Sequence, residues 1–169
     1  PDDRLAFNRL AFPHRLGDDR IELRTIGDPE RDRVVVRSTI TDREGLRYTI
    51  GEPAGPAEVG QLYRLFLQAG FPVPLAAADS HYVVTDEAEQ IVGGVIYRET
   101  DDQSVFLEGI VVTPTLSERG IAAAALEDFC TRMAARRYRH VKTHFFLRRF
   151  YQRHGFRTDP RWGGLVRLL

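Results

Sequence analysis

Residues 105–126, VFLEGIVVTPTLSERGIAAAAL, combine an apolar strand pattern, a polar turn and an alanine-rich helix pattern. Pro114 ends the strand pattern, Gly120 lets the chain turn, and the alanines that follow favour a helix. A helix that begins in small residues leaves its first backbone N–H groups accessible. These groups and the positive end of the helix dipole attract phosphate. The stretch therefore predicts a phosphate-binding strand, turn and helix, around which we expect the rest of the chain to be organised.

Glu108 is the one acidic residue in the strand pattern at 105–112. Because side chains alternate along a strand, we expect Glu108 to share a face with Phe106, Ile110 and Val112. A carboxylate on an apolar face has its charged form disfavoured by desolvation, so its pKa rises towards that of a useful general base. The alternative interpretation is an acid at a sheet edge that faces solvent or pairs with an arginine.

The histidines and the single cysteine give weaker signals. His144 is either a second base, since imidazole titrates near neutral pH, or a hydrogen-bonded structural residue. His81, His140 and His154 form no ligand-like grouping with Cys130, so we expect no metal site. Cys130 lies within a helical pattern and fits a small core residue rather than a nucleophile.

Hydrophobic periodicity indicates the elements that position these residues. Alternating or β-branched stretches predict strands, and apolar residues at helical spacing predict helices. Strands are expected at residues 21–26, 34–41, 46–50, 81–85, 91–99, 105–112, 141–146, 156–158 and 164–168, and helices at residues 58–70, 118–136 and 147–154. Short polar turns predict antiparallel pairing of the earlier strands, whereas the helix at 118–136 predicts one parallel crossover. The fold class is therefore α+β.

The composition is that of an ordinary globular protein, but charge is unevenly distributed. The 169-residue chain is 43% hydrophobic, and no apolar run is long enough for a membrane span. Residues 51–129 carry three arginines against thirteen acids, whereas residues 130–169 carry eleven basic residues against one acid. The basic third fits a nucleic-acid surface, a site for a phosphate-rich small ligand, or a solvated face. A net charge of zero and the lack of interleaved aromatic residues disfavour nucleic acid.

Residues 51–56, GEPAGP, have the composition of a linker. We therefore expect residues 1–52 to form a β-rich N-terminal extension, or the remnant of an upstream domain, and residues 57–169 to form the functional domain. Because the sequence starts with Pro rather than Met, we expect the chain to be processed or cut from something longer. The single cysteine and the charged first residues favour a cytoplasmic location.

Residues 57–169 carry two motifs that together resemble the GNAT superfamily of acyl-CoA-dependent N-acetyltransferases. The family pattern is a strand that ends in an apolar residue, one further residue and Pro, then Q/R-x-x-G-x-G/A and a helix, with a later F-Y-x-x-x-G-F. The matching residues are Val112, Pro114, Gly120 and Ala122 in the first motif, and Phe150, Tyr151, Gly155 and Phe156 in the second. The resemblance implies a mixed, mostly antiparallel sheet with helices on both faces. It also implies a splay between the fourth and fifth core strands, here 105–112 and 141–146.

The resemblance further implies where acyl-CoA binds. Backbone groups of Ile110, Val111 and Val112 would pair with the pantetheine arm like an added strand. Pyrophosphate would bind the loop that follows, whose implied contact residues are Ser117, Glu118, Arg119, Gly120, Ile121, Ala122 and Ala123. Ser117 replaces the usual Gln or Arg, and we expect Arg119 to compensate by charge. His144 stands where many members have an Asn close to the pantetheine or the amine.

The same resemblance assigns catalytic roles. Tyr151 would donate a proton to the departing thiolate of CoA, and Glu108 would act as the base, directly or through water. The sequence thus predicts transfer of an acetyl or other short acyl group from acyl-CoA to a primary amine by direct attack. The alternative is a non-catalytic acyl-CoA-binding regulatory or interaction domain of a larger protein.

The expected partners follow from these roles. They are acyl-CoA and an amine acceptor, which is a small molecule or a protein lysine or N-terminus, and the acidic middle segment favours a cationic acceptor. We expect no nucleic-acid or membrane partner, and either a homodimer or a parent multidomain chain.

Overall fold

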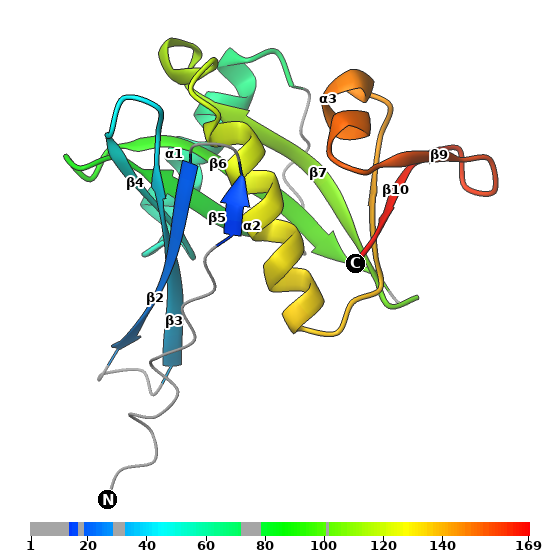
Figure 1. Cartoon of the computed structure of the whole chain (residues 1–169), viewed down its shortest axis with the longest axis horizontal. Coiled ribbons are helices and arrows are strands. Elements are labelled where there is room, and N and C mark those ends of the chain that lie inside the picture. Colours follow the sequence, from blue (N-terminus) through cyan, green and yellow to red (C-terminus); the bar gives the residue numbers. More distant parts are fainter. Residues whose placement is uncertain (1–13, 17–18, 29–32, 72–78, 101) are drawn as a thin grey trace, which may run out of the picture.

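The computed structural model describes residues 14–16, 19–28, 33–71, 79–100 and 102–169, and within these ranges ten strands form one sheet. The strands are β1 His14–Leu16, β2 Asp19–Asp28, β3 Arg33–Thr41, β4 Arg47–Gly51, β5 Ser80–Thr85, β6 Ile91–Glu99, β7 Ser104–Val112, β8 His140–Thr143, β9 Arg157–Asp159 and β10 Gly164–Leu168. Their spatial order is β1-β2-β3-β4-β5-β6-β7-β8-β10-β9 (Figure 1). Neighbouring strands are antiparallel except for the parallel pair β7 and β8. The predicted mostly antiparallel sheet with one parallel crossover is confirmed.

Three α-helices occur in the described ranges: α1 Pro56–Gln68, α2 Ile121–Ala135 and α3 Arg148–Arg153. Pro56 occupies the first turn of α1, where a missing N–H costs nothing, and Gly70 with φ of 78° follows the end of the helix. The connection between β7 and β8 contains a short 3₁₀ helix, η2 Pro114–Leu116, and then α2. None of these helices is long and apolar enough to cross a membrane.

The two longer helices cover opposite faces of the sheet. On one face, Leu62 and Phe66 of α1 pack with Val83, Ile96 and Val111 in one buried cluster. On the other face lies α2 (Figure 1), which packs in a larger buried cluster that runs from β3 to β10. Along β5, β6 and β7, successive side chains point alternately into the one cluster and the other, as the pleat of a strand requires. Helices on both faces, as the resemblance implied, are therefore present.

The hairpin of β3 and β4 is part of the same packing. The cluster that α2 covers includes Ile40, Tyr48 and Ile50. Because β4 pairs with β5, the hairpin belongs to the same sheet as the later strands. Polar contacts add to this. The hydroxyl of Ser38, which is fully buried, donates to Asp128 on α2. Arg132, one turn further along α2, donates to the carbonyl of Ile50 at 3.2 Å.

Among the element boundaries that differ from the sequence prediction, two lie beside the loops that follow β7 and β8. The helix expected at 118–136 begins at Ile121, because η2 and a turn occupy the residues after Pro114 and Gly120 has φ of 82°. The strand expected at 141–146 ends at Thr143, because Leu147 takes a left-handed backbone with φ of 55° and leads directly into α3. Both shifts shorten regular structure around the loops that follow β7 and β8.

Candidate active site

Strands β7 and β8 pair only along part of their length. Ser104 to Leu107 pair in register with His140 to Thr143, and β8 then ends while β7 continues to Val112. The hydroxyl of Thr143 donates to the carbonyl of Leu107 at 2.8 Å, at the last pair of the ladder. Beyond this point, the edge of β7 that faces away from β6 carries no ladder among the described residues. The expected splay is therefore present, and Ile110, Val111 and Val112 lie along it.

Glu108 occupies a β-bulge at the start of the splay. Ile96 of β6 pairs with Gly109 and Tyr97 pairs with Leu107, so Glu108 is an extra residue without a partner in the register. Gly109 lies directly under α1, where a Cβ atom would come within 2.8 Å of the Phe66 ring. A side chain at 109 would therefore require the Phe66 ring to shift.

The bulge corrects the face predicted for Glu108. Phe106 and Glu108 both contact Arg98, so those two residues do share the α1 side of the sheet. Ile110 and Val112, however, pack in the cluster on the α2 side. Strict alternation was wrong here because the extra residue shifts the side-chain phase of everything after it.

The carboxylate of Glu108 lies in a largely buried, acidic setting. Its side chain is 14% exposed, with Oε1 at 3.6 Å from Nε of Arg98. Burial, and then the neighbouring Asp79, raise the pKa of Glu108 to about 7, and Arg98 opposes the shift. Asp79 also accepts a hydrogen bond from Tyr63 of α1 at 3.3 Å. Both sequence interpretations hold in part: the acid is desolvated like a base and it also faces an arginine.

Tyr151, in α3, lies on the α2 side of the same fork of strands. It is 3% exposed in the α2-side cluster, and its ring packs edge-on against Phe156 at 5.1 Å. Burial raises the pKa of Tyr151 to about 12, and a hydrogen bond with Thr143 works against this rise. The phenol therefore keeps its proton at neutral pH and shares Thr143 with the last pair of the β7–β8 ladder.

The loop before α2 presents backbone donors. Gly120 adopts φ of 82°, and the first bond along the helix runs from the N–H of Ala124 to the carbonyl of Gly120 at 3.0 Å. The N–H groups of Ile121, Ala122 and Ala123 precede that bond, so the helix itself offers them no acceptor. Ser117 and Glu118 are exposed on the same loop. These groups and the helix dipole are the ones that the sequence predicts to bind phosphate.

Arg119 points elsewhere. Its own N–H donates to the carbonyl of Leu116 at 3.2 Å. Its guanidinium lies 3.3 Å from the buried Asp42 and 2.9 Å from Glu44, both in the β3–β4 turn. Two carboxylates therefore already balance the charge that was expected to compensate for Ser117.

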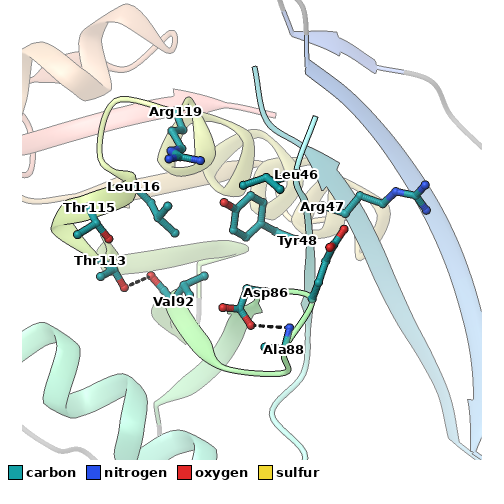
Figure 2. A pocket seen from close by; sticks show the side chains of 11 residues that line it. Leu46, Arg47, Tyr48, Asp86, Ala88, Val92, Thr113, Thr115, Leu116 and Arg119 are labelled. Carbon is teal, nitrogen blue, oxygen red and sulfur yellow. Dashed lines mark hydrogen bonds between the residues drawn. The ribbon is translucent and has the colours of Figure 1, made fainter. Parts of the chain in front are cut away.

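Figure 2 shows the pocket of about 430 Å³ into which this part of the loop faces. Arg119, Leu116 and Thr113 line it from the loop, Tyr48 lines it from β4, and Asp86 lines it from the β5–β6 connection. Thr113 fixes the start of the loop, since its hydroxyl donates to the carbonyl of Val92 at 2.9 Å. The loop is thus anchored to the β3–β4 turn through Arg119 and to β6 through Thr113.

Aromatic residues of differing exposure lie around the α1 side of the splay. His144 follows β8 and is exposed, with its ring 4.7 Å from that of Phe106. Trp162, from the β9–β10 connection, packs edge-on against Phe106 with 5.7 Å between the ring centres. Phe146, which is 53% exposed, packs against Phe71 at 4.6 Å. Apolar side chains therefore flank the strand segment that carries Glu108.

Sequence reasoning missed several residues of this site. Asp79, Tyr63 and Arg98 surround Glu108, and Thr143 links the two strands, yet none stands in a recognisable motif. Arg98 lies in register with Phe106 on the neighbouring strand, and that pairing becomes visible only in the structure. Cys130 is buried as predicted, and burial raises the pKa of its thiol to about 12. No cluster of three or more potential metal ligands occurs in the described part of the chain.

Comparison with known proteins places this arrangement in a family. Residues 78–158 match the model of the acetyltransferase (GNAT) domain. No curated protein matches the sequence significantly. Among solved structures, a GNAT-family acetyltransferase from Staphylococcus aureus Mu50 aligns with a TM-score of 0.62 at 13% identity, over 72% of this chain and 99% of that chain.

Two further structures show the same fold. The ribosomal-protein-S18-alanine N-acetyltransferase from Escherichia coli aligns with a TM-score of 0.56 at 14% identity, over 72% of this chain and 90% of that one. The N-acetylglutamate synthase from Neisseria gonorrhoeae, solved with coenzyme A and N-acetyl-glutamate, aligns with a TM-score of 0.59 at 11% identity, over 72% and 35%. The forked sheet, the open helix terminus and the family match agree, and the chain therefore carries an acetyltransferase domain of the GNAT family.

Proposed function

We propose that the protein is an acyl-CoA-dependent N-acetyltransferase that moves an acetyl or other short acyl group to a primary amine by direct attack. The observation that carries the proposal is the fork between β7 and β8. Glu108 lies on one side of the last pair of the ladder and Tyr151 hydrogen-bonds Thr143 on the other. A base and an acid at the opening of one splay are what proton removal from an amine and proton delivery to a thiolate require.

The residues present fit acyl-CoA as the co-substrate. The open edge of β7 at Ile110, Val111 and Val112 suits the amide-bearing pantetheine arm, which can pair with it as a strand does. The N–H groups of Ile121, Ala122 and Ala123, next to Gly120, suit the pyrophosphate, with the hydroxyl of Ser117 on the same loop. His144 lies exposed past the end of β8, beside this path.

The chemistry of the chain's own residues follows. Glu108, with a pKa raised to about 7, is largely ionised at slightly alkaline pH and takes the proton of the amine. The backbone N–H of Val111 or Val112 polarises the thioester carbonyl as an oxyanion donor. Tyr151, which stays protonated at neutral pH, gives its proton to the departing thiolate and is restored from water.

The acceptor is proposed to be a primary amine on a small molecule, a protein lysine or a protein N-terminus. The acidic pair Glu108 and Asp79 supports a cationic acceptor, because negative charge favours the approach of an ammonium group. The exposed Phe146 and the ring of Phe106 offer apolar surface on either side of that pair. These features support an amine that carries an apolar substituent.

Thiol release from acetyl-CoA across a panel of amines tests the proposal. We expect turnover with at least one amine, and a fall of at least about tenfold in Glu108→Gln or Tyr151→Phe. Glu89→Gln, at an exposed position, and Tyr138→Phe, at a half-buried position outside the site, are matched controls and should retain the wild-type rate. The alternative, a non-catalytic acyl-CoA-binding domain, predicts calorimetric binding of acetyl-CoA without turnover, and binding that neither Glu108→Gln nor Tyr151→Phe changes.

A further inference from the structure

A chain of polar side chains leads away from Glu108 on the α1 side of the sheet. Glu108 hydrogen-bonds to Asp79, which precedes β5. Asp79 accepts a hydrogen bond from the hydroxyl of Tyr63 at 3.3 Å, and the same hydroxyl lies 3.2 Å from Nε2 of His81. Four ionisable groups from three different elements therefore form one continuous series.

The far end of this series reaches a polar pocket. His81 is one of the residues that line a pocket of about 590 Å³, together with Ser80, Glu52 and Arg136. Tyr63, on the sheet-facing side of α1, is only 7% exposed and links Asp79 to His81. The buried base and the open pocket are thus connected through hydrogen bonds at a point where water has little access.

We propose that Asp79, Tyr63 and His81 form a proton path that carries the proton taken up by Glu108 out to this pocket. The proposal rests on the proposed function, since it begins with the proton of the amine. It gives the acceptor site a route for proton release that the amine and acyl-CoA do not block.

The transfer balances along the series. The amine nitrogen gives a proton to the Glu108 carboxylate, which passes one to Asp79. Asp79 then gives its proton to the Tyr63 oxygen while the Tyr63 hydroxyl proton moves to Nε2 of His81. His81 releases the proton on Nδ1 to water in the pocket, and rotation of the hydroxyl and the ring restores the starting arrangement. One proton leaves, and each of the four residues regains its charge.

The Tyr63 hydroxyl is suited to this exchange, because it lies within reach of two acceptors and can donate to only one of them at a time. Burial, and then Asp79, raise the pKa of Tyr63 to about 12, so it stays a neutral hydroxyl. Burial lowers the pKa of His81, and Asp79 opposes this, so the imidazole is free to accept a proton at neutral pH.

The charged groups that face the series come from several elements. Arg98 of β6 faces Glu108, and Asp79 faces Glu108, Tyr63 and His81. Glu108 in turn faces Tyr63 of α1. Burial and then Asp79 favour the protonated form of Glu108, whereas Arg98 favours its ionised form.

Turnover of Tyr63→Phe and His81→Ala with acetyl-CoA and the best amine of the panel tests the path. We expect kcat to fall by about tenfold in each variant with little change in KM for acetyl-CoA, and the solvent deuterium isotope effect on kcat to increase. Added imidazole should restore kcat in His81→Ala in proportion to its concentration, because it can accept the proton from Tyr63. A purely structural role would not respond to imidazole.

Tyr138→Phe is the matched control, since Tyr138 is half-buried, its hydroxyl also neighbours an acid, Glu99, and it lies outside the series and the candidate site. Its kcat should stay within about twofold of wild type. If the wild type turns over and both path variants keep the wild-type kcat from pH 6 to pH 9, the proton path is wrong and the proposed function stands. If the wild type turns over no amine, the proposed function itself fails.

Discussion

Thr143 donates its side-chain hydrogen bond to the carbonyl of Leu107 at 2.8 Å, at the point where β7 and β8 separate. The bond supplies a partner for a carbonyl at the end of the ladder, and Thr143 also hydrogen-bonds Tyr151. One buried hydroxyl therefore holds both the fork and the proposed acid in place.

Replacing this hydroxyl should loosen the fork. We expect Thr143→Val to lower the free energy of unfolding by about 1–2 kcal/mol, because a buried carbonyl and the Tyr151 hydroxyl each lose a partner. Urea denaturation measures the change. Thr131→Val, which removes a hydroxyl that bonds to Glu127 within its own helix at 2.9 Å, is the control and should change stability far less.

The pH dependence of turnover should report Glu108. Its pKa is raised to about 7, so the base form accumulates only above that pH, and kcat/KM should rise with pH through about 7 and then level off. Arg98 lowers the pKa of Glu108, so Arg98→Gln should move the rise to higher pH. The midpoint should stay the same for amines of different pKa. A midpoint that follows the pKa of the amine instead would contradict the assignment.

The same raised pKa should make stability fall with rising pH, whereas turnover rises. Between the unfolded value of 4.5 and about 7, the folded protein binds more protons at Glu108 than the unfolded chain does. The free energy of unfolding therefore falls as pH rises through this window. Glu108→Gln should remove that part of the pH dependence and should be more stable than wild type at pH 8, as thermal unfolding at pH 4.5 and pH 8 would show.

The link between Asp42 and Arg119 should stabilise the loop before α2. Asp42 accepts hydrogen bonds from the N–H groups of Glu44 and Leu46 at 2.9 Å each, and Arg119 lies 3.3 Å away. We expect Asp42→Ala to cost about 2–3 kcal/mol of unfolding free energy, because it leaves buried donors without an acceptor. Glu44→Ala, at the exposed partner of Arg119, should cost less than about 1 kcal/mol.

Gly120→Ala tests the turn that opens α2. A side chain at φ of 82° costs about 1 kcal/mol, and we expect weaker binding of CoA in calorimetry because the loop must shift. Gly60→Ala is a control of opposite sign. Gly60 lies inside α1 with open space where a Cβ would be, so alanine there should stabilise the protein by about 0.5–1 kcal/mol. Unchanged CoA affinity in Gly120→Ala would contradict the role of this turn.

Local sequence patterns were sufficient for most of the fold. Alternation and helical spacing located the strands and helices, since each pattern depends only on which face of an element is buried. The crossover from β7 through α2 to β8 could also be predicted, because the helix length and the motif spacing are local properties. The GNAT domain was recognisable from two motifs that surround this crossover.

The site was harder to predict, because its contacts join distant parts of the chain. No local pattern reveals that Glu108 is an extra residue in a bulge, since that depends on the register of β6 against β7. Likewise, Arg119 pairs with Asp42 across 77 residues, so its expected role toward phosphate could not be weighed against that partner. Asp79 and Tyr63 became relevant only once α1 and β5 brought them to Glu108.

The contacts of the β3–β4 hairpin with α2 couple the local opening of the hairpin to that of the helix start. Arg132 bonds to β4 near one end of the helix, and Arg119 bonds to the β3–β4 turn just before the other end. Opening the hairpin alone would break the bond from Ser38 to Asp128 and the bond from Arg119 to Asp42. The hairpin and the loop before α2 should therefore open as one cooperative unit. Slowly exchanging amides in β4 would then become better protected whenever a ligand holds the start of α2, although the ligand never touches that strand.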